Sequence, residues 1–115
     1  MAATRNRRDA TMRSMSTTYR NPKLLALARI APRCFGCGTP NDGTVVGAHA
    51  NMQSMGKGTG HKAADLPAFV CVRCHDAIDG RTSEHKSRSA RNAAWSEAAI
   101  HSLRWALENH PEVFA

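Results

Sequence analysis

Two cysteine pairs of the form C-x-x-C carry the strongest chemical signal in this sequence of 115 residues. Cys34 and Cys37 make the first pair, and Cys71 and Cys74 make the second. Four thiolates give a closed tetrahedral zinc site, which is structural because no coordination position is left for water or substrate. A redox function, or burial of the thiols without a metal, is the alternative. We expect a structural zinc, since paired cysteines in a reducing compartment are more often zinc ligands than disulfides.

A second group of side chains continues from the last cysteine. His75 and Asp79 lie four residues apart, so a helix would place both on one side, about one turn apart. They could share a divalent cation. His49 is the remaining candidate for proton abstraction, and Asp65 could accept a hydrogen bond from its other ring nitrogen and fix the tautomer. Singly, each residue has a plainer interpretation as a solvated side chain or a cap, and together they indicate a site.

Short elements are predicted around the first cysteine pair. Pro22 can occupy the first helical position, and the apolar residues after it predict a helix over residues 22–30. Its core-facing residues would be Leu24, Leu27, Ala28 and Ala31. Residues 44–48 predict a short strand that ends at His49, and residues 65–71 predict a second strand.

Helical segments are predicted after the second cysteine pair. Residues 75–79 continue as a helical turn or two, and Gly80 permits the helix to end. Residues 90–109 have helical composition, with Ser87 or Ser89 available as N-cap. The apolar residues of this helix at compatible spacing are Trp95, Ala99, Leu103, Ala106 and Leu107. Its simplest function is packing.

The polar segment over residues 50–64 contains the sequence GKGTG. It is not a phosphate-binding P-loop, which requires the pattern G-x-x-x-x-G-K-[ST] after a strand. Lys57 and Lys62 could still contact phosphate groups. The alternative is a mobile loop whose glycines only permit tight turns.

The net charge of +7 lies entirely within residues 1–33, which hold eight basic groups against one acidic group. Residues 34–115 hold eight of each and sum to zero. A cationic arm on a neutral body is typical of contact with nucleic-acid phosphates, and the alternative is a solvated tail. We expect a basic, flexible arm over residues 1–18 and a single domain over residues 19–115.

Composition also indicates where the protein works. Hydrophobic residues make up 42% of the chain, but no apolar run approaches the roughly 18 residues that a membrane span needs. The basic, polar N-terminus is not followed by the apolar segment of a secretory signal. We therefore expect a cytoplasmic protein with no membrane partner.

The order Ala48-His49, Asp65-Leu66 and then Cys71 to Asp79 resembles the HNH endonucleases, whose ββα-metal finger is often stapled by a four-cysteine zinc. More closely, RNPKLLALARIAPRC, VVGAHAN, GKGTGHKAAD and CVRCHDAIDGR are similar to the YbcO-like predicted nucleases of phages and prophages. The resemblance covers roughly residues 19–105. It implies an α+β fold, a small zinc-stapled ββα-metal (HNH) finger with flanking N- and C-terminal helices.

The resemblance also implies a function for each candidate residue. His49 matches the general base of the family, and Asp65 stands where an asparagine orients that base. His75 matches the last histidine, which is a metal ligand. Asp79 lies where many members place a further ligand, one helical turn on.

The chain departs from the family pattern at two positions. Asp65 replaces an asparagine and keeps its acceptor function. Ala48 replaces the aspartate or histidine that often supplies another metal ligand, which leaves two protein ligands and implies weak binding of the ion. The residues that could compensate are Asn51, His61 and Asp76.

The mechanism implied is hydrolysis of DNA phosphodiester bonds with one divalent ion, Mg²⁺ or another, in a bacterial host cell. His49 would deprotonate water for in-line attack, while the ion on His75 and Asp79 would stabilise the developing charge. Arg73 and Arg81 are candidates for phosphate contacts beside the site, and a solvated position is the alternative for either.

Two other classes of protein fit the same residues. One is a non-catalytic, zinc-stapled DNA-binding or adaptor module, in which Ala48 marks the loss of metal binding. The other is a structural zinc protein that binds another protein through the helix over residues 90–109. A homodimer would be needed for two-fold cutting, and the sequence leaves the oligomeric state open.

Overall fold

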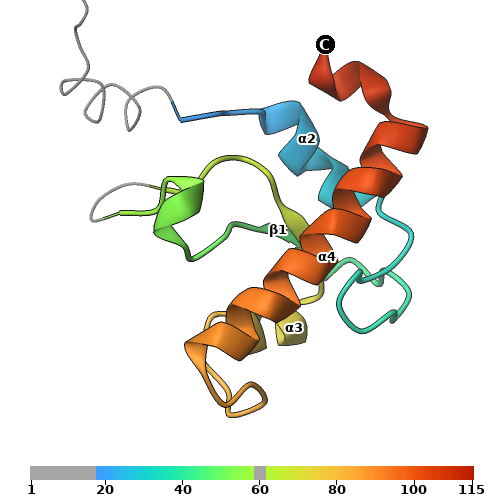
Figure 1. The fold of residues 1–115 in the computed structure, drawn as a ribbon. Helices are drawn as coiled ribbons and strands as arrows, with labels where there is room; N and C mark the ends of the chain where they lie inside the picture. The colour runs from blue at the N-terminus through green and yellow to red at the C-terminus, as the bar shows by residue number, and fades with distance from the viewer. Residues whose placement is uncertain (1–17, 59–61) are drawn as a thin grey trace, which may run out of the picture.

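The structure is a computed structural model that describes residues 18–58 and 62–115. Within these residues it is a small α+β arrangement of a two-stranded sheet and helices (Figure 1). The elements are helix α2 (Pro22–Ala26), 3-10 helix η1 (Leu27–Arg29), strand β1 (Val46–Ala48), 3-10 helix η2 (Gln53–Met55), strand β2 (Ala68–Val70), helices α3 (Val72–Ile78) and α4 (Arg88–Asn109), and 3-10 helix η3 (Pro111–Phe114). The arm expected over residues 1–18 falls almost wholly outside the described residues, as does His61. No helix in the described part of the chain is long and apolar enough to cross a membrane.

Asn21 begins the first helix. Its side-chain oxygen accepts a 3.0 Å hydrogen bond from the N–H of Leu24, which is the N-cap arrangement that asparagine favours. The α-helix ends at Ala26 and continues as the tighter η1, so the helix predicted over residues 22–30 is confirmed with a 3-10 final turn. Its predicted core residues are all buried, namely Leu24, Leu27, Ala28 and Ala31.

Strands β1 and β2 form an antiparallel hairpin. The paired residues are Val46 with Val70, Gly47 with Phe69, and Ala48 with Ala68. Both strands are shorter than the predicted runs. Pro67 has no N–H to donate, which explains why β2 begins only at the next residue. His49 follows β1 directly, as the sequence predicts.

Helix α3 begins three residues before the predicted turn over residues 75–79. Cys71 is its N-cap in an extended conformation, with φ −69° and ψ 165°. The second cysteine pair therefore occupies the start of the helix, where Cys74 falls in the first turn. Gly80 has a φ of 79° and follows the C-cap, in agreement with the predicted end.

Helix α4 lies across the hairpin (Figure 1) and makes two buried hydrogen bonds to it. The indole N–H of Trp95 donates to the carbonyl oxygen of Ala48 over 2.9 Å. The hydroxyl of Ser102 accepts from the N–H of Phe69 over 2.8 Å. The helix begins at Arg88, and Ser87 is the N-cap.

The core-facing side of α4 differs in part from the predicted side. Trp95, Ala99 and Ala106 are buried as predicted, but Leu107 is 56% exposed, so its assignment to the packed side was wrong. At 3.6 residues per turn, position 106 lies about 20° from Trp95 around the helix, and position 107 lies about 120° away. Ser102 lies on the buried side instead, where its hydroxyl satisfies the backbone of β2.

Candidate functional site

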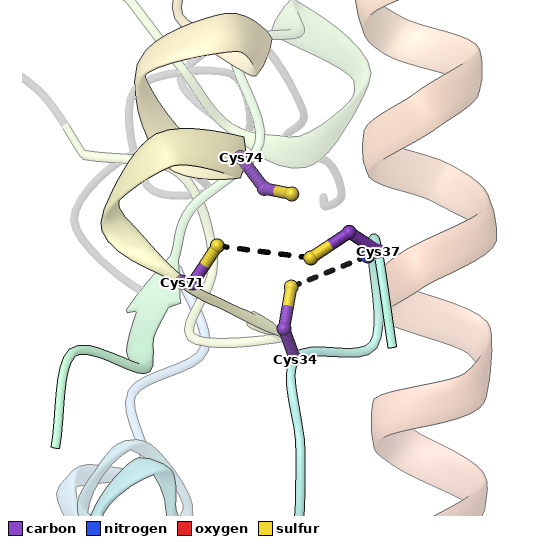
Figure 2. A group of neighbouring side chains, drawn as sticks. All are labelled: Cys34, Cys37, Cys71 and Cys74. Carbon is purple, nitrogen blue, oxygen red and sulfur yellow. Dashed lines mark hydrogen bonds between the residues drawn. The ribbon is translucent and has the colours of Figure 1, made fainter. Parts of the chain in front are cut away.

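The four cysteine sulfurs meet between α3 and the loop that precedes β1 (Figure 2). Their Sγ atoms all lie within 4.8 Å of one another, and those of Cys37 and Cys71 are 3.9 Å apart. Zinc with four bonds of about 2.3 Å requires sulfur atoms about 3.8 Å apart. The residues present therefore fit a tetrahedral zinc ion. The clustering predicted from the two C-x-x-C pairs is confirmed.

Backbone groups of the first cysteine loop support the cluster. The N–H groups of Gly36 and Cys37 both lie 3.3 Å from the Sγ atom of Cys34, to which they donate. Glycine at position 36 leaves room for the cluster, because an added Cβ would lie in tight contact with it, 3.2 Å from the Sγ atom of Cys74. Gly38 has a φ of 83°, a left-handed backbone conformation that favours glycine.

Thr39 lowers the pKa of the Cys37 thiol. Its Oγ1 atom lies 3.0 Å from the Sγ atom, and this contact, with the backbone of Thr39, lowers the pKa of Cys37 to about 6. Burial raises the pKa values of Cys71 and Cys74. A bound zinc ion would supply the positive charge that holds all four as thiolates.

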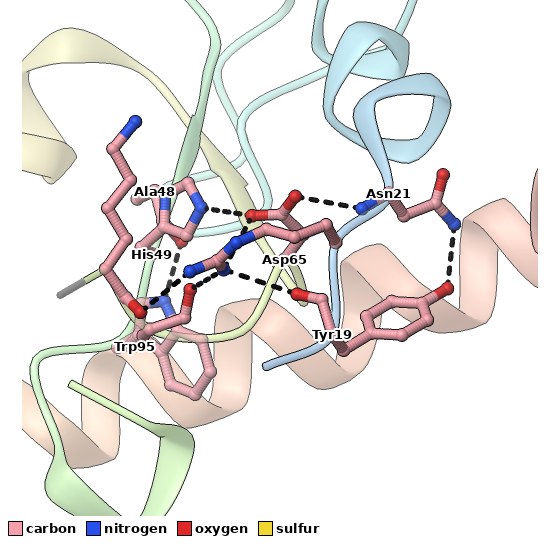
Figure 3. A network of polar contacts seen from close by, with 9 residues as sticks. Tyr19, Asn21, Ala48, His49, Asp65 and Trp95 are labelled. Atoms are coloured by element: carbon pink, nitrogen blue, oxygen red, sulfur yellow. Dashed lines mark hydrogen bonds and ion pairs between the residues drawn. The ribbon is translucent and has the colours of Figure 1, made fainter. Parts of the chain in front are cut away.

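The second part of the region is a contact between His49, at the end of β1, and Asp65, ahead of β2. The Nε2 atom of His49 lies 2.7 Å from the Oδ1 atom of Asp65 (Figure 3). Because an ionised carboxylate only accepts hydrogen bonds, Nε2 carries the hydrogen in the neutral imidazole. The Nδ1 atom then keeps its lone pair and can accept a proton. The contact predicted from the sequence is therefore present.

The carboxylate of Asp65 is fixed from its other side by Asn21. The backbone N–H of Asn21 donates to Oδ2 over 2.9 Å (Figure 3), and the Asp65 side chain is only 6% exposed. Burial acts to raise the pKa of Asp65, but the hydrogen bonds from His49 and Asn21 and the charges of His49 and Arg20 outweigh it. The pKa of Asp65 therefore lies below its ordinary value, and the group is ionised at neutral pH.

Arg20 attaches the loop ahead of Asp65 to the first helix. Its Nη1 atom donates to the carbonyl oxygen of Ala63 over 2.6 Å, and Nη2 donates to that of Lys62 over 3.1 Å. The same guanidinium lies 3.5 Å from the Oδ1 atom of Asp65. Arg20 thus fixes the backbone that presents Asp65 and adds a positive charge beside it.

On α3, His75 and Asp79 lie on one side of the helix, as their spacing predicts. The Nε2 atom of His75 is 3.1 Å from the Oδ2 atom of Asp79. Two ligand atoms in adjacent octahedral positions around Mg²⁺ would be about 3.0 Å apart, so this pair fits a divalent ion. Asn51, two residues after His49, donates to the Oδ1 atom of Asp79 over 2.8 Å. This bond links the end of the hairpin to α3.

The comparison with known protein families adds evidence of a different kind. The family described as "Putative nuclease YbcO" matches residues 26–109. The chain belongs to the YbcO family. This membership indicates a nuclease, for which the substrate is nucleic acid. No curated protein and no solved structure matches the chain.

The basic residues that the sequence marks in this YbcO-family chain lie in different places. Lys57 and Lys62 are exposed in the segment between the strands. Arg73 lies on the cysteine side, where a hydrogen bond with Cys37 raises its pKa, and its Nη1 atom is 3.4 Å from Glu84. Arg81 lies beside Asp79 instead, with its Nη1 atom 2.9 Å from Oδ2.

Several residues of the candidate site were not predicted from the sequence. Asn21 could have been found as an N-cap, because it precedes Pro22 and an apolar run. No local pattern marks Arg20, whose partners lie more than 40 residues further along the chain. Trp95 was predicted only as a core residue, and its hydrogen bond to Ala48 depends on how α4 packs.

Proposed function

We propose that this YbcO-family protein is a metal-dependent endonuclease of the HNH type that hydrolyses DNA phosphodiester bonds during phage DNA replication, recombination or processing. The observation that carries the proposal is the 2.7 Å contact between His49 and Asp65, at the end of the hairpin where the connecting segment joins the two strands. Two antiparallel strands followed by a helix, with His75 on that helix, give the order of elements expected for an HNH finger.

His49 is the general base in this proposal. Asp65 accepts from Nε2 and orients the ring, so Nδ1 takes the proton from the water that attacks phosphorus. Asp65 stays ionised through the reaction and stabilises the imidazolium that forms. Its own orientation depends on the backbone N–H of Asn21, which is fixed by the first helix.

His75 and Asp79 are the residues that would hold a catalytic divalent ion. Such an ion supplies positive charge for the developing negative charge on the phosphate and the leaving oxygen. Asn51 orients the carboxylate of Asp79 through its 2.8 Å hydrogen bond. The side-chain nitrogen of Asn51 is therefore a positioning group, while its oxygen is one candidate to complete the ligand set.

A second function is favoured by one specific observation. Ala48 occupies the position where the HNH pattern often has a further metal ligand, and this residue is 1% exposed with its carbonyl oxygen bonded to Trp95. Its methyl group cannot bind an ion, and its carbonyl oxygen accepts the hydrogen bond from Trp95. A zinc-stapled DNA-binding module without catalysis is the alternative that this position supports.

Nicking of supercoiled plasmid DNA tests both functions. Purified protein with added Mg²⁺ or Mn²⁺ should convert the plasmid to open circles, and His49→Ala should abolish the conversion. His101→Ala is the matched control, because His101 is an exposed histidine on α4. Cleavage by His49→Ala at the wild-type rate would exclude the general-base assignment. DNA binding without nicking under any metal would favour the second function.

A further inference from the structure

A polar pocket lies between the end of α3 and the first turns of α4. It is lined by Asn51, Ile78, Asp79, Arg81, Arg88, Arg91 and Asn92. The lining residues include three arginines and one aspartate, so the pocket carries a net positive charge. Asn51 and Asp79 also belong to the region proposed to hold the divalent ion, so the pocket is continuous with that region.

The three arginines differ in how far their charges are already neutralised. The guanidinium nitrogens of Arg81 lie 2.9 Å from carboxylate oxygens of both Asp76 and Asp79, so its positive charge is already neutralised within the protein. Arg88 and Arg91 make no ion pair or side-chain hydrogen bond with any residue in the ranges 18–58 and 62–115. Two guanidinium groups on successive turns of α4 therefore remain available to a ligand.

The backbone turn after α3 lets Arg91 reach the pocket. An ideal Cβ added at Gly80 would lie 3.2 Å from the Nε atom of Arg91 and 3.3 Å from its Cζ atom. The guanidinium thus packs directly over a glycine, and the φ of 79° at this position disfavours any other residue. This packing directs the side chain of Arg91 towards α3 and reduces the freedom that a ligand would have to remove.

We propose that Arg88 and Arg91 bind a backbone phosphate of the nucleic acid, next to the phosphodiester bond that the water activated by His49 attacks. This inference rests on the proposed function. It means that α4 would bind nucleic acid in addition to packing against the hairpin. The guanidinium fork matches the oxygen atoms of a phosphate, and the amide of Asn92 adds an uncharged donor to the lining. The described lining residues include no aromatic side chain on which a base could stack, so the pocket recognises the sugar-phosphate backbone and not the sequence.

The test is DNA binding measured apart from cleavage. The His49→Ala protein, with no divalent ion added, is titrated against a fluorescently labelled short duplex, and anisotropy is followed at several salt concentrations. In this background Arg88→Gln with Arg91→Gln should weaken binding by about tenfold or more. The slope of log K against log salt should fall by about one for each arginine that loses a phosphate. Replacement of both by lysine should restore most of the slope, because the charge is kept.

Arg104→Gln is the matched control on the same helix. Arg104 is 3.0 Å from Glu108, and position 104 lies about 20 Å or more along the helix axis from positions 88 and 91. Its removal should leave binding within twofold of the parent protein. Circular dichroism and thermal unfolding of each variant establish that the fold is kept. If the double glutamine variant unfolds, the single variants Arg88→Gln and Arg91→Gln test the pocket, because each should lower the salt slope by about one.

The outcomes separate the pocket from the proposed function. Wild-type protein that nicks plasmid DNA, together with a double glutamine variant that binds like the parent, would overturn the pocket and leave the endonuclease standing. Binding that depends on both arginines in a protein that never nicks DNA would support the pocket and contradict the endonuclease. A parent protein that binds no DNA even at low salt would overturn the pocket assignment.

Discussion

The indole nitrogen of Trp95 lies 2.9 Å from the carbonyl oxygen of Ala48, the residue immediately before His49. This hydrogen bond fixes the end of β1 against the middle of the long helix α4. Ser102 makes the corresponding contact with β2 over 2.8 Å. The position of the proposed base therefore depends on a helix that begins almost 40 residues after it.

Trp95→Phe tests this dependence. The substitution keeps an aromatic ring but leaves the buried carbonyl oxygen of Ala48 without a donor. We expect the free energy of unfolding to fall by about 1–3 kcal/mol, measured by urea denaturation. The rate of plasmid nicking should fall as well, because His49 loses a fixed backbone position. Unchanged stability and unchanged nicking would show that α4 does not position the hairpin end.

A pair of leucine truncations tests the orientation of α4. Leu107→Ala should change the free energy of unfolding by less than about 0.5 kcal/mol, because 56% of Leu107 is already exposed. Leu24→Ala removes the same atoms from a residue that is 0% exposed, and should cost about 2–5 kcal/mol. Equal losses in the two variants would place Leu107 in the core and contradict the helix orientation described above.

Removal of zinc should unfold much of the domain. We expect one zinc ion per chain in purified protein, measured by elemental analysis, and loss of both metal and thermal stability in Cys34→Ser. Thr39→Val is the matched variant with all four thiols intact but without the 3.0 Å hydrogen bond to Cys37. It should retain zinc with an affinity about 10–100-fold weaker. Full stability of the Cys34→Ser protein would exclude a structural zinc.

Asp65→Asn should alter how stability depends on pH. The folded-state pKa of Asp65 is lowered, so its ionised form stabilises the fold above the unfolded-state pKa, and this contribution is lost as the pH falls through the folded-state value. The variant should be less stable by about 1–3 kcal/mol at neutral pH. The deficit should shrink below about pH 4.

The measurement is urea denaturation of both proteins between neutral pH and the acid limit of folding. Glu97→Gln, at a side chain that is 80% exposed on α4, provides the control and should leave the pH profile unchanged. A deficit that stays constant, or grows, as the pH falls would contradict the direction assigned to the pKa of Asp65.

Asp79→Asn and Asp76→Asn form a matched pair on α3 and its C-cap. Asp79 contacts His75, Asn51 and Arg81, whereas Asp76 contacts Arg81. If Asp79 binds the catalytic ion, its replacement should raise the Mg²⁺ concentration needed for half-maximal nicking by about tenfold or more. Replacement of Asp76 should not. Equal effects would indicate that the ion is not bound where we propose.

Much of the region could be predicted from local sequence, because metal-binding residues have strict spacing. The C-x-x-C pairs identified the cysteine cluster, and the four-residue spacing of His75 and Asp79 placed them on one side of a helix. The pairing of His49 with Asp65 followed from their chemistry and from the strands on which they were predicted.

The residues that escaped prediction depend on tertiary packing. Ser102 has no apolar signal, yet it faces the core of the molecule because a buried N–H of β2 needs an acceptor. Leu107 shows the opposite error. Its apolar side chain suggested burial, but the orientation of the helix leaves it exposed to solvent. The pocket arginines at positions 88 and 91 are ordinary helix formers in sequence, and only the approach of α3 to α4 brings them beside Asp79.

Asn21 connects the proposed active site to the two ends of the described fold, and this connection bears on when the site forms during folding. Its backbone N–H binds Asp65, and its side-chain nitrogen donates to the carbonyl oxygen of Val113, 92 residues further along the chain. We expect contacts between such distant segments to form late in folding, because closing a long loop costs conformational entropy. The carboxylate that orients His49 is therefore completed only when the first helix and the segment after α4 have both docked. We therefore expect that a chain still being synthesised, even one with its zinc in place, would lack the complete site that we propose.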